Sequence, residues 1–569
     1  MKTDSERREL MFWGMALLFV ALASSLPSLS PHHVFEGYDL AFHLDRIEGL
    51  KDALLARQFP VRMNPVQLGG YGMPTDIFYP DLFLYLPALL RMLGVPLLTC
   101  WQMFLVFASL LTAFAGWWGF AVYLRSWRAG AVAALFYVTA LFRFVMAYIS
   151  AASGAILAMA FLPAALAAIW RMLRDEPRMW LPAVFFSTCV LESHVLTGIM
   201  LVLAALGMAV FSFRSFRVPE VRWAAAKAAG FLFLLNLWFY APLWALRRSM
   251  DFPLKQVTHQ EINYAMIYPL REGDFYTGSA FLLLLLVLGG LLVWRKDRAL
   301  KKFCGWCAVS AVFILMMSHP QPWHLLGRAA GALQYPARLT VFPAMFLSIA
   351  AAIGFEAVGK SGKSGKSGNL GSRQRWSALL CALVCLAGNL IWLYGYSYSL
   401  PPQPRQRQML LVRRVSTSDY LEHLDRGYSG YRDYMLASAS KRWKDDAQLR
   451  AKFGDRELHP SDRTVHVSRQ GTSFDVQYAA GVEAELQFPI FWYPGYVARD
   501  DEGQLLPIRC DEDGQVRVQS PASESGGLHL QYEGFSWFRW TDRISLLGGI
   551  GFLCLWYRNR KHCRKGTFV

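Results

Sequence analysis

The sequence predicts a polytopic α-helical membrane protein that carries an extracytoplasmic α+β domain near its C-terminus. Three observations support this class. The 569 residues are 54% hydrophobic and 15% aromatic, which soluble domains rarely reach. Apolar runs long enough to cross a bilayer recur along the chain. A polar segment with strand-like alternation separates the last of these runs from the others.

The apolar runs predict about twelve transmembrane helices of about 20 residues each. The first lies at 11–30, and we expect it to be retained because no A-x-A cleavage site follows it. Residues 82–94 are short and contain Pro87 and Arg91, so they predict a re-entrant or interfacial helix. The remaining spans are predicted at 99–124, 129–149, 154–172, 179–193, 196–213, 222–246, 278–294, 303–318, 339–358, 376–396 and 541–557.

The distribution of charge predicts that both termini are cytoplasmic. Lys and Arg outnumber Asp and Glu by 58 to 41, and basic residues occupy every connection that would then be cytoplasmic, including the tail at 558–565. The outer turns at 150–153 and 192–197 contain no Lys or Arg. This is the positive-inside pattern. The surplus of positive charge therefore indicates membrane orientation and contact with the lipid bilayer, with no nucleic acid as partner.

This topology divides the chain into three parts. They are a transmembrane domain (1–398) with outer loops at 31–98 and 247–277 and a cytoplasmic linker at 359–375, an extracytoplasmic domain (399–540), and a last transmembrane helix with a basic tail (541–569). Within the extracytoplasmic domain, short alternating segments separated by Gly- and Asp-containing turns predict a small β-sandwich at about 464–533.

The first outer loop concentrates polar residues that the apolar runs lack. Apolar residues at helical spacing predict an amphipathic helix over 40–57. Asp39, His43 and Arg46 then share one face of this helix. An acid, an imidazole and a guanidinium aligned just outside a span indicate a site, although an interfacial helix with a solvated polar face explains the same pattern.

Ionisable residues also gather at the outer ends of the predicted spans, where burial in a membrane is costly. A helix cap or a snorkelling arginine explains each residue taken alone. Together they suggest an outward-facing polar cavity that suits a phosphate-bearing ligand presented from the lipid phase. These candidates are Arg143 with Tyr148, Glu192 and His194, Arg247 and Arg248, His319 and His324, and Arg338.

Several motifs occur in a characteristic order. They are G-Y-D-L-A-F-H-L-D-R-I at 37–47, F-P-V-R at 59–62, G-Y-G-M-P-T-D-I-F-Y-P at 70–80, Ser193-His194, L-Q-Y-P-A-R at 333–338, and F-P-I-F-W-Y-P-G-Y at 488–496. In this order the chain resembles the GT-C superfamily of membrane glycosyltransferases. More narrowly, it resembles bacterial membrane proteins called 6-pyruvoyl-tetrahydropterin synthase-related.

The resemblance implies a GT-C-like transmembrane domain in the bacterial cytoplasmic (inner) membrane. It implies a catalytic carboxylate in the first outer loop, which falls on Asp39, a sugar donor linked to polyprenyl phosphate, and an extracytoplasmic acceptor. Many members carry two acids close together in this loop, whereas here Glu36 precedes Asp39 by three residues. This departure leaves open both a role for Glu36 and the need for a divalent metal ion.

Transfer from a phospho-sugar requires a base for the acceptor hydroxyl and positive charge for the departing phosphate. The expected catalytic residues are Asp39, His43 and Glu36, and the expected substrate- or phosphate-binding residues are Arg338, Arg143, His194, Arg247 and Tyr335. Two other functions fit the same sequence, namely a non-catalytic scaffold for cell-envelope polysaccharide assembly and a transporter of lipid-linked saccharide. Only an enzyme needs the carboxylate of Asp39 specifically.

Overall fold

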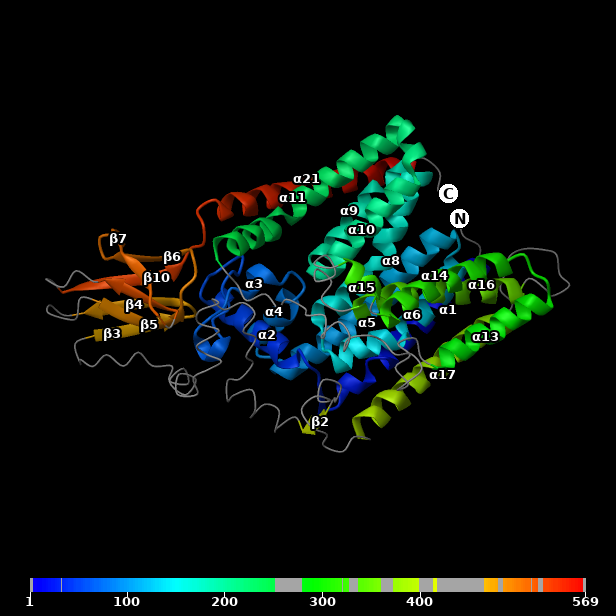
Figure 1. Cartoon of the computed structure of the whole chain (residues 1–569), viewed down its shortest axis with the longest axis horizontal. Coiled ribbons are helices and arrows are strands. Elements are labelled where there is room, and N and C mark those ends of the chain that lie inside the picture. The colour runs from blue at the N-terminus through cyan, green and yellow to red at the C-terminus, as the bar shows by residue number, and fades with distance from the viewer. Residues whose placement is uncertain are drawn as a thin grey trace. The chain divides into compact units, whose positions relative to one another are not determined.

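The computed structural model describes most of the chain (Figure 1). The described residues are 4–31, 33–250, 279–319, 321–326, 336–359, 372–398, 413–416, 465–478, 485–512, 514–519 and 525–565. The predicted outer loop beyond residue 250 and the cytoplasmic linker from 360 to 371 lie outside the described residues. The chain forms two compact units, Met1–Leu40, Gln102–Leu232 and Val257–Thr417 in the first, and Ala41–Trp101, Phe233–Gln256 and Ser418–Val569 in the second.

The first unit is almost entirely helical. Its helices, some of which continue into the second unit, are α1 (Asp4–Ala23), α5 (Leu97–Leu124), α6 (Trp127–Val138), α7 (Leu141–Phe144), the π-helix η3 (Val145–Ile149), α8 (Ser153–Arg174), α9 (Trp180–Leu191), α10 (Val195–Phe211), α11 (Pro219–Ser249), α13 (Ser279–Trp294), α14 (Leu300–Ser318), α15 (Gln321–Leu326), η7 (Pro336–Thr340), α16 (Val341–Gly359) and α17 (Ser372–Tyr398). One short antiparallel pair joins β1 (His33–Glu36) to β2 (Arg413–Ser416).

Among the described residues, six helices are long and apolar enough to cross a membrane. They are α5, α8, α11, α14, the segment Pro336–Val358 and α17. A seventh span results when α6 and the segment Leu141–Ile149, which are bent by 48°, count as one. Other predicted spans coincide with helices that are shorter or more polar, such as α1 and α10. The mostly helical membrane architecture is confirmed, and the total of about twelve spans stays a prediction.

The helix predicted over 40–57 is confirmed as α2 (Leu40–Leu55). Its apolar stripe, which includes Leu44, Ile47 and Leu50, is fully buried, as expected for residues at helical spacing on one face. After α2, the loop contains α3 (Thr75–Phe78) and α4 (Tyr85–Met92). α4 is a short helix within the predicted 82–94 segment, and α2 to α4 belong to the second unit apart from Leu40.

The strand-rich region predicted near the C-terminus is present in the second unit. A five-stranded antiparallel sheet has the order β3-β4-β10-β6-β7, and a three-stranded sheet has the order β5-β9-β8. The strands are β3 (Val465–Gln470), β4 (Ser473–Tyr478), β5 (Glu485–Phe491), β6 (Tyr496–Asp500), β7 (Leu505–Leu506), β8 (Ile508–Cys510), β9 (Gln515–Gln519) and β10 (Gly526–Tyr532). The last helix, α21 (Phe538–Lys565), follows β10.

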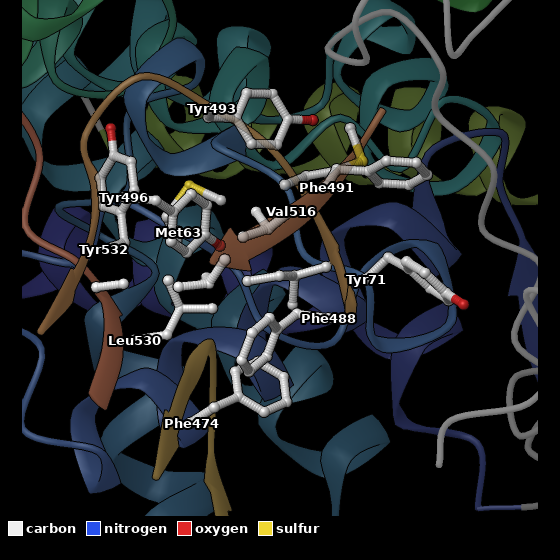
Figure 2. Packing of buried hydrophobic residues seen from close by; sticks show 14 of the residues in the cluster. Met63, Tyr71, Phe474, Phe488, Phe491, Tyr493, Tyr496, Val516, Leu530 and Tyr532 are labelled. Carbon is white, nitrogen blue, oxygen red and sulfur yellow. The ribbon is translucent and has the colours of Figure 1, made fainter. Parts of the chain in front are cut away.

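The two sheets share one buried core. Phe474 and Leu530 from the larger sheet and Phe488 and Val516 from the smaller sheet belong to the same apolar cluster (Figure 2). Met63 of the first loop is also buried in this cluster. The alternation of buried and exposed residues along β4 is what a strand with one face on a core requires. The loop 41–101 and the sheets therefore fold together as one unit.

The predicted topology is testable directly. A reporter fused at Lys363 should report the cytoplasm, because the positive-inside pattern places the basic linker there. A reporter fused at Gly514, in the turn before β9, should report the outer compartment. Paired alkaline phosphatase and fluorescent-protein fusions measure both positions. An outer location for Lys363 would contradict the span assignment.

Candidate functional site

Asp39 lies in the turn between β1 and α2, in the first unit. Its backbone N–H donates to the carbonyl oxygen of Ser150 at 3.0 Å. The turn approaches this neighbour so closely that a Cβ at Gly37 would lie 2.6 Å from the Cβ of Ala151, so only glycine fits. Asp39 itself is partly exposed. The backbone of Asp39 is therefore fixed, while the residue keeps part of its surface exposed.

Buried hydrogen bonds of Arg143 and Tyr148 fix the segment 145–150, whose Ser150 carbonyl oxygen accepts from the Asp39 backbone N–H. The guanidinium of Arg143, 1% exposed, donates to the carbonyl oxygen of Val138 (2.7 Å) and to the hydroxyl oxygens of Ser109 (3.0 Å) and Ser24 (2.5 Å). The Tyr148 hydroxyl donates to the carbonyl oxygen of Ser24 at 2.8 Å. These bonds give Arg143 a structural role in positioning η3, and the phosphate-binding role predicted for it stays a prediction.

The structure brings together two residues that the sequence separates widely. Arg338 Nη1 lies 3.1 Å from His194 Nε2, across 144 residues. Because a guanidinium can only donate, Nε2 accepts from Arg338. On the other side of the ring, Nδ1 accepts from the Thr197 backbone N–H at 3.3 Å and lies 2.8 Å from Thr197 Oγ1, which fixes the ring at the start of α10. Burial, and then the positive charge of Arg338, hold the pKa of His194 well below its usual value. The neutral imidazole thus orients a cationic guanidinium.

Two predicted catalytic residues have different surroundings. Glu36 is partly exposed at the end of β1, in the same unit as Asp39 and opposite Arg413 in the strand pairing. His43 belongs to the second unit and is fully buried. Its ring stacks on Trp101, with centroids 6.0 Å apart and planes at 8°. Asp39 and His43, which the sequence places on one helix face, therefore belong to different units, the first and the second respectively.

The remaining predicted residues are separate from these groups. Arg247 is exposed in the last turn of α11, in the second unit. Tyr335 lies outside the described residues. In the part of the chain that the structure describes, no group of three or more His, Cys, Asp or Glu side chains is placed to hold a metal ion. The divalent metal ion considered from the sequence therefore has no ligand set within this part.

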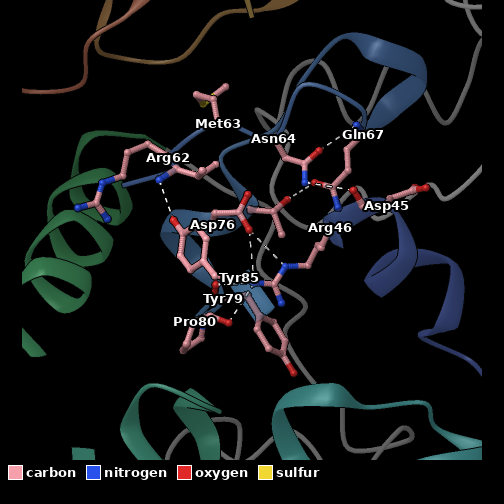
Figure 3. A network of polar contacts seen from close by, with 12 residues as sticks. Asp45, Arg46, Arg62, Met63, Asn64, Gln67, Asp76, Tyr79, Pro80 and Tyr85 are labelled. Atoms are coloured by element: carbon pink, nitrogen blue, oxygen red, sulfur yellow. Dashed lines mark hydrogen bonds and ion pairs between the residues drawn. The ribbon is translucent and has the colours of Figure 1, made fainter. Parts of the chain in front are cut away.

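The second unit contains a buried polar network that the sequence did not predict (Figure 3). Arg46 of α2 forms an ion pair with Asp76 at 3.3 Å, and both side chains are fully buried. The same guanidinium donates to the carbonyl oxygens of Tyr79 and Pro80, each at 3.0 Å. Helical spacing places Arg46 on the polar face of α2, but nothing local indicates a partner 30 residues away.

Asp81 lies in the same network and is 1% exposed. Among the described residues, neither of its carboxylate oxygens has a hydrogen-bond partner of normal geometry, and the same holds for Asp76 Oδ2 and Arg46 Nη1. Burial raises the pKa of Asp81 to about 7 and that of Asp76 to about 6, while Arg46 opposes both shifts. Both acids therefore titrate close to neutral pH.

We expect the stability of the second unit to fall as the pH rises through the titration of Asp76 and Asp81. Folding raises both pKa values from the usual value of about 4 to about 6 and about 7. The folded state therefore binds more protons, and this stabilisation is complete below about pH 4 and lost through pH 6–7. Asp81→Asn should flatten the decline in melting temperature of the full-length protein between pH 5 and 8.

The matched control for this measurement is Glu502→Gln, which changes an exposed carboxylate in the turn after β6. It should leave the pH dependence as in the wild type. An Asp81→Asn protein with the full wild-type decline would show that these acids titrate equally in the folded and unfolded chains.

The apolar helices define a multi-pass membrane protein. Residues 5–423 match the model described as "Family of unknown function (DUF6541)", and the chain belongs to this family. No protein of curated function matches the chain by sequence. The narrower resemblance to the 6-pyruvoyl-tetrahydropterin synthase-related membrane proteins stays a prediction.

Several solved structures are similar to the chain at low sequence identity. The archaeal oligosaccharyltransferase AglB from Archaeoglobus fulgidus, solved with an inhibitory peptide and a dolichol-phosphate, is 12% identical with a TM-score of 0.40. ArnT from Cupriavidus metallidurans, bound to undecaprenyl phosphate, is 14% identical with a TM-score of 0.35. The arabinofuranosyltransferase AftD from Mycobacteria is 16% identical with a TM-score of 0.38.

The matches cover 79%, 69% and 68% of this chain, and 60%, 66% and 27% of AglB, ArnT and AftD. The chain thus spans about three fifths of the length of the archaeal oligosaccharyltransferase. With TM-scores of 0.40 and below, these similarities leave its function to be inferred from its own residues.

Proposed function

We propose that this protein transfers a sugar from a polyprenyl-phosphate-linked donor to an extracytoplasmic glycan, lipid or protein acceptor. The observation that carries the proposal is the contact of Arg338 with the neutral ring of His194. This cation belongs to the same compact unit as Asp39, which is partly exposed. A base and an oriented cation are the two groups that transfer from a phospho-sugar requires. The order of the sequence motifs supports the same reaction.

In the proposed reaction, the acceptor hydroxyl oxygen attacks the anomeric carbon of the donor sugar. Asp39 takes the hydroxyl proton as the new glycosidic bond forms. The bond between the anomeric carbon and the phosphate oxygen breaks, and its electron pair leaves with the lipid phosphate. Arg338 stabilises that negative charge, since a guanidinium can bind phosphate through two N–H groups.

The other predicted residues have supporting parts in this proposal. His194 positions Arg338 through Nε2 and contributes no charge of its own. Glu36, at the end of β1 and three residues before Asp39, is the second acid near the proposed base. Arg143 positions the segment that holds the Asp39 backbone. His43, Arg247 and Tyr335 are assigned no step.

Release of the lipid product tests the proposal. The purified full-length protein, reconstituted in lipid nanodiscs, is given a panel of polyprenyl-phosphate hexoses and pentoses together with simple glycoside acceptors. Release of polyprenyl phosphate that depends on both the protein and the acceptor is the expected result. A folded protein that releases none, but moves lipid-linked saccharide across vesicles, would be a transporter. A protein that does neither but binds polysaccharide would be a scaffold.

A further inference from the structure

Exposed arginines and tryptophans gather where α11 ends and α21 begins, in the second unit. We call this group the arginine–tryptophan collar. Trp244 and Trp540 are 60% and 62% exposed, and all four arginines of the group are exposed. The collar consists of Trp244, Arg247 and Arg248 on α11 and Arg539, Trp540 and Arg543 on α21.

Direct contacts join the two helices of the collar, which run side by side in Figure 1. The Ser545 hydroxyl accepts from Trp238 N at 3.0 Å and donates to the Leu234 carbonyl oxygen at 2.7 Å. Leu246 and Phe538, at the two helix ends, belong to one buried cluster. Because α11 ends where α21 begins, residues 244–248 and 539–543 lie at the same end of this helix pair.

Each helix presents an arginine beside an exposed indole ring. The guanidinium of Arg248 lies 4.9 Å from the centre of the Trp244 ring, and that of Arg543 lies 5.2 Å from the centre of the Trp540 ring. Exposed tryptophans at the ends of apolar helices occupy the headgroup level of a bilayer, where an amphipathic ring has one apolar and one polar neighbour. The arginines are therefore held at the level of lipid phosphates.

The positive charge of the collar has no carboxylate partner among the described residues. The nearby acid on α21, Asp542, is already bonded to Arg62 at 2.6 Å. Arg62 also donates to the carbonyl oxygen of Trp238 at 2.9 Å. In the predicted topology this end of the helices is the outer one, where the positive-inside rule disfavours arginine. An anion bound at that position would offset the cost of four exposed arginines there.

We propose that the collar binds the phosphate headgroups of anionic phospholipids in the adjoining leaflet. A guanidinium matches a phosphate through two parallel N–H···O bonds, and the neighbouring indole rings contact the boundary between headgroup and acyl chain. This inference goes beyond the proposed glycosyl transfer and is independent of it, because the collar selects lipids of the bilayer whether or not a donor is present.

Lipid binding by the full-length protein tests the inference without any turnover. Nanodiscs of phosphatidylcholine with a titrated fraction of phosphatidylglycerol are used, and native mass spectrometry counts the retained phosphatidylglycerol. The wild type should prefer phosphatidylglycerol, and Arg247→Gln/Arg248→Gln and Arg539→Gln/Arg543→Gln should each weaken that preference. Each arginine near a membrane surface contributes about fivefold, so each pair should account for on the order of tenfold or more.

The matched control is Arg499→Gln/Arg509→Gln, which removes the same charge from the strands of the second unit, where both side chains pair with carboxylates. It should keep the wild-type preference. Replacing all four collar arginines by Lys, which keeps the charge but loses the bidentate geometry, should retain part of it. Wild-type preference in both Gln pairs, or an equal loss in the control, would overturn the inference. Displacement of phosphatidylglycerol by equimolar inorganic phosphate would show a free-phosphate site instead.

Discussion

Replacing Asp39 with Asn should lower turnover by about 10²- to 10⁴-fold, the usual effect of losing a general base. Asn has nearly the shape of Asp but cannot take a proton from an acceptor hydroxyl. The backbone bond from Asp39 N to Ser150 O is unaffected by the change, so the turn should fold normally. Initial rates of polyprenyl phosphate release, compared at equal amounts of folded protein, measure the effect.

Asp39 also immediately precedes α2, where a side chain often caps a helix. Asn caps a helix almost as well as Asp, so a purely structural role predicts nearly wild-type turnover in Asp39→Asn. Glu502→Gln is the control, because it removes an exposed carboxylate in the turn after β6 that has no part in the proposed reaction, and it should keep wild-type turnover. Wild-type turnover in a folded Asp39→Asn protein would remove the main reason to regard the chain as an enzyme.

The second large effect is expected at Arg338. Arg338→Ala should weaken donor binding by about 3 kcal/mol or more, which is on the order of 100-fold, because the phosphate loses a charged hydrogen-bonding partner. Arg338→Lys should recover only part, since an ammonium cannot bind phosphate through two N–H groups in a fixed plane. Binding of polyprenyl phosphate to protein in nanodiscs, measured by titration calorimetry, checks both variants.

Arg499→Ala, on β6, serves as the control for the loss of one positive charge. Equal affinity in Arg338→Lys and the wild type would show that Arg338 contributes only general charge. Unchanged affinity in Arg338→Ala would place the lipid phosphate elsewhere in the protein.

The elements that the sequence predicted are those that local periodicity determines. The helix α2 was predictable because Leu44, Ile47 and Leu50 repeat at helical spacing and are all buried. The bend after α6 was not predictable in this way. There, Asn389 of α17 donates to the carbonyl oxygen of Thr139 at 2.5 Å, which satisfies a backbone group at the break between the two helices. That partner is 250 residues away.

In the candidate site, too, single residues were predictable from the sequence, whereas contacts between distant residues were not. The sequence picked out Asp39, His194 and Arg338 as separate polar residues near span ends, but it contained no signal for the contact between the last two. The ion pair of Arg46 with Asp76 was not predicted either, although both residues lie in the first outer loop, where polar residues are concentrated. Pairings across many residues depend on tertiary packing, which helical spacing does not encode.

The contacts of α11 have a consequence for the order in which the chain can fold. Pro242 has no N–H, so the Trp238 carbonyl loses its usual helical donor, and Arg62 replaces it. The adjacent backbone groups bond to Ser545 of the last helix. One turn of α11 therefore takes partners from an early loop and from a helix synthesised hundreds of residues later. The native set of hydrogen bonds in that turn is therefore complete only after translation has delivered α21.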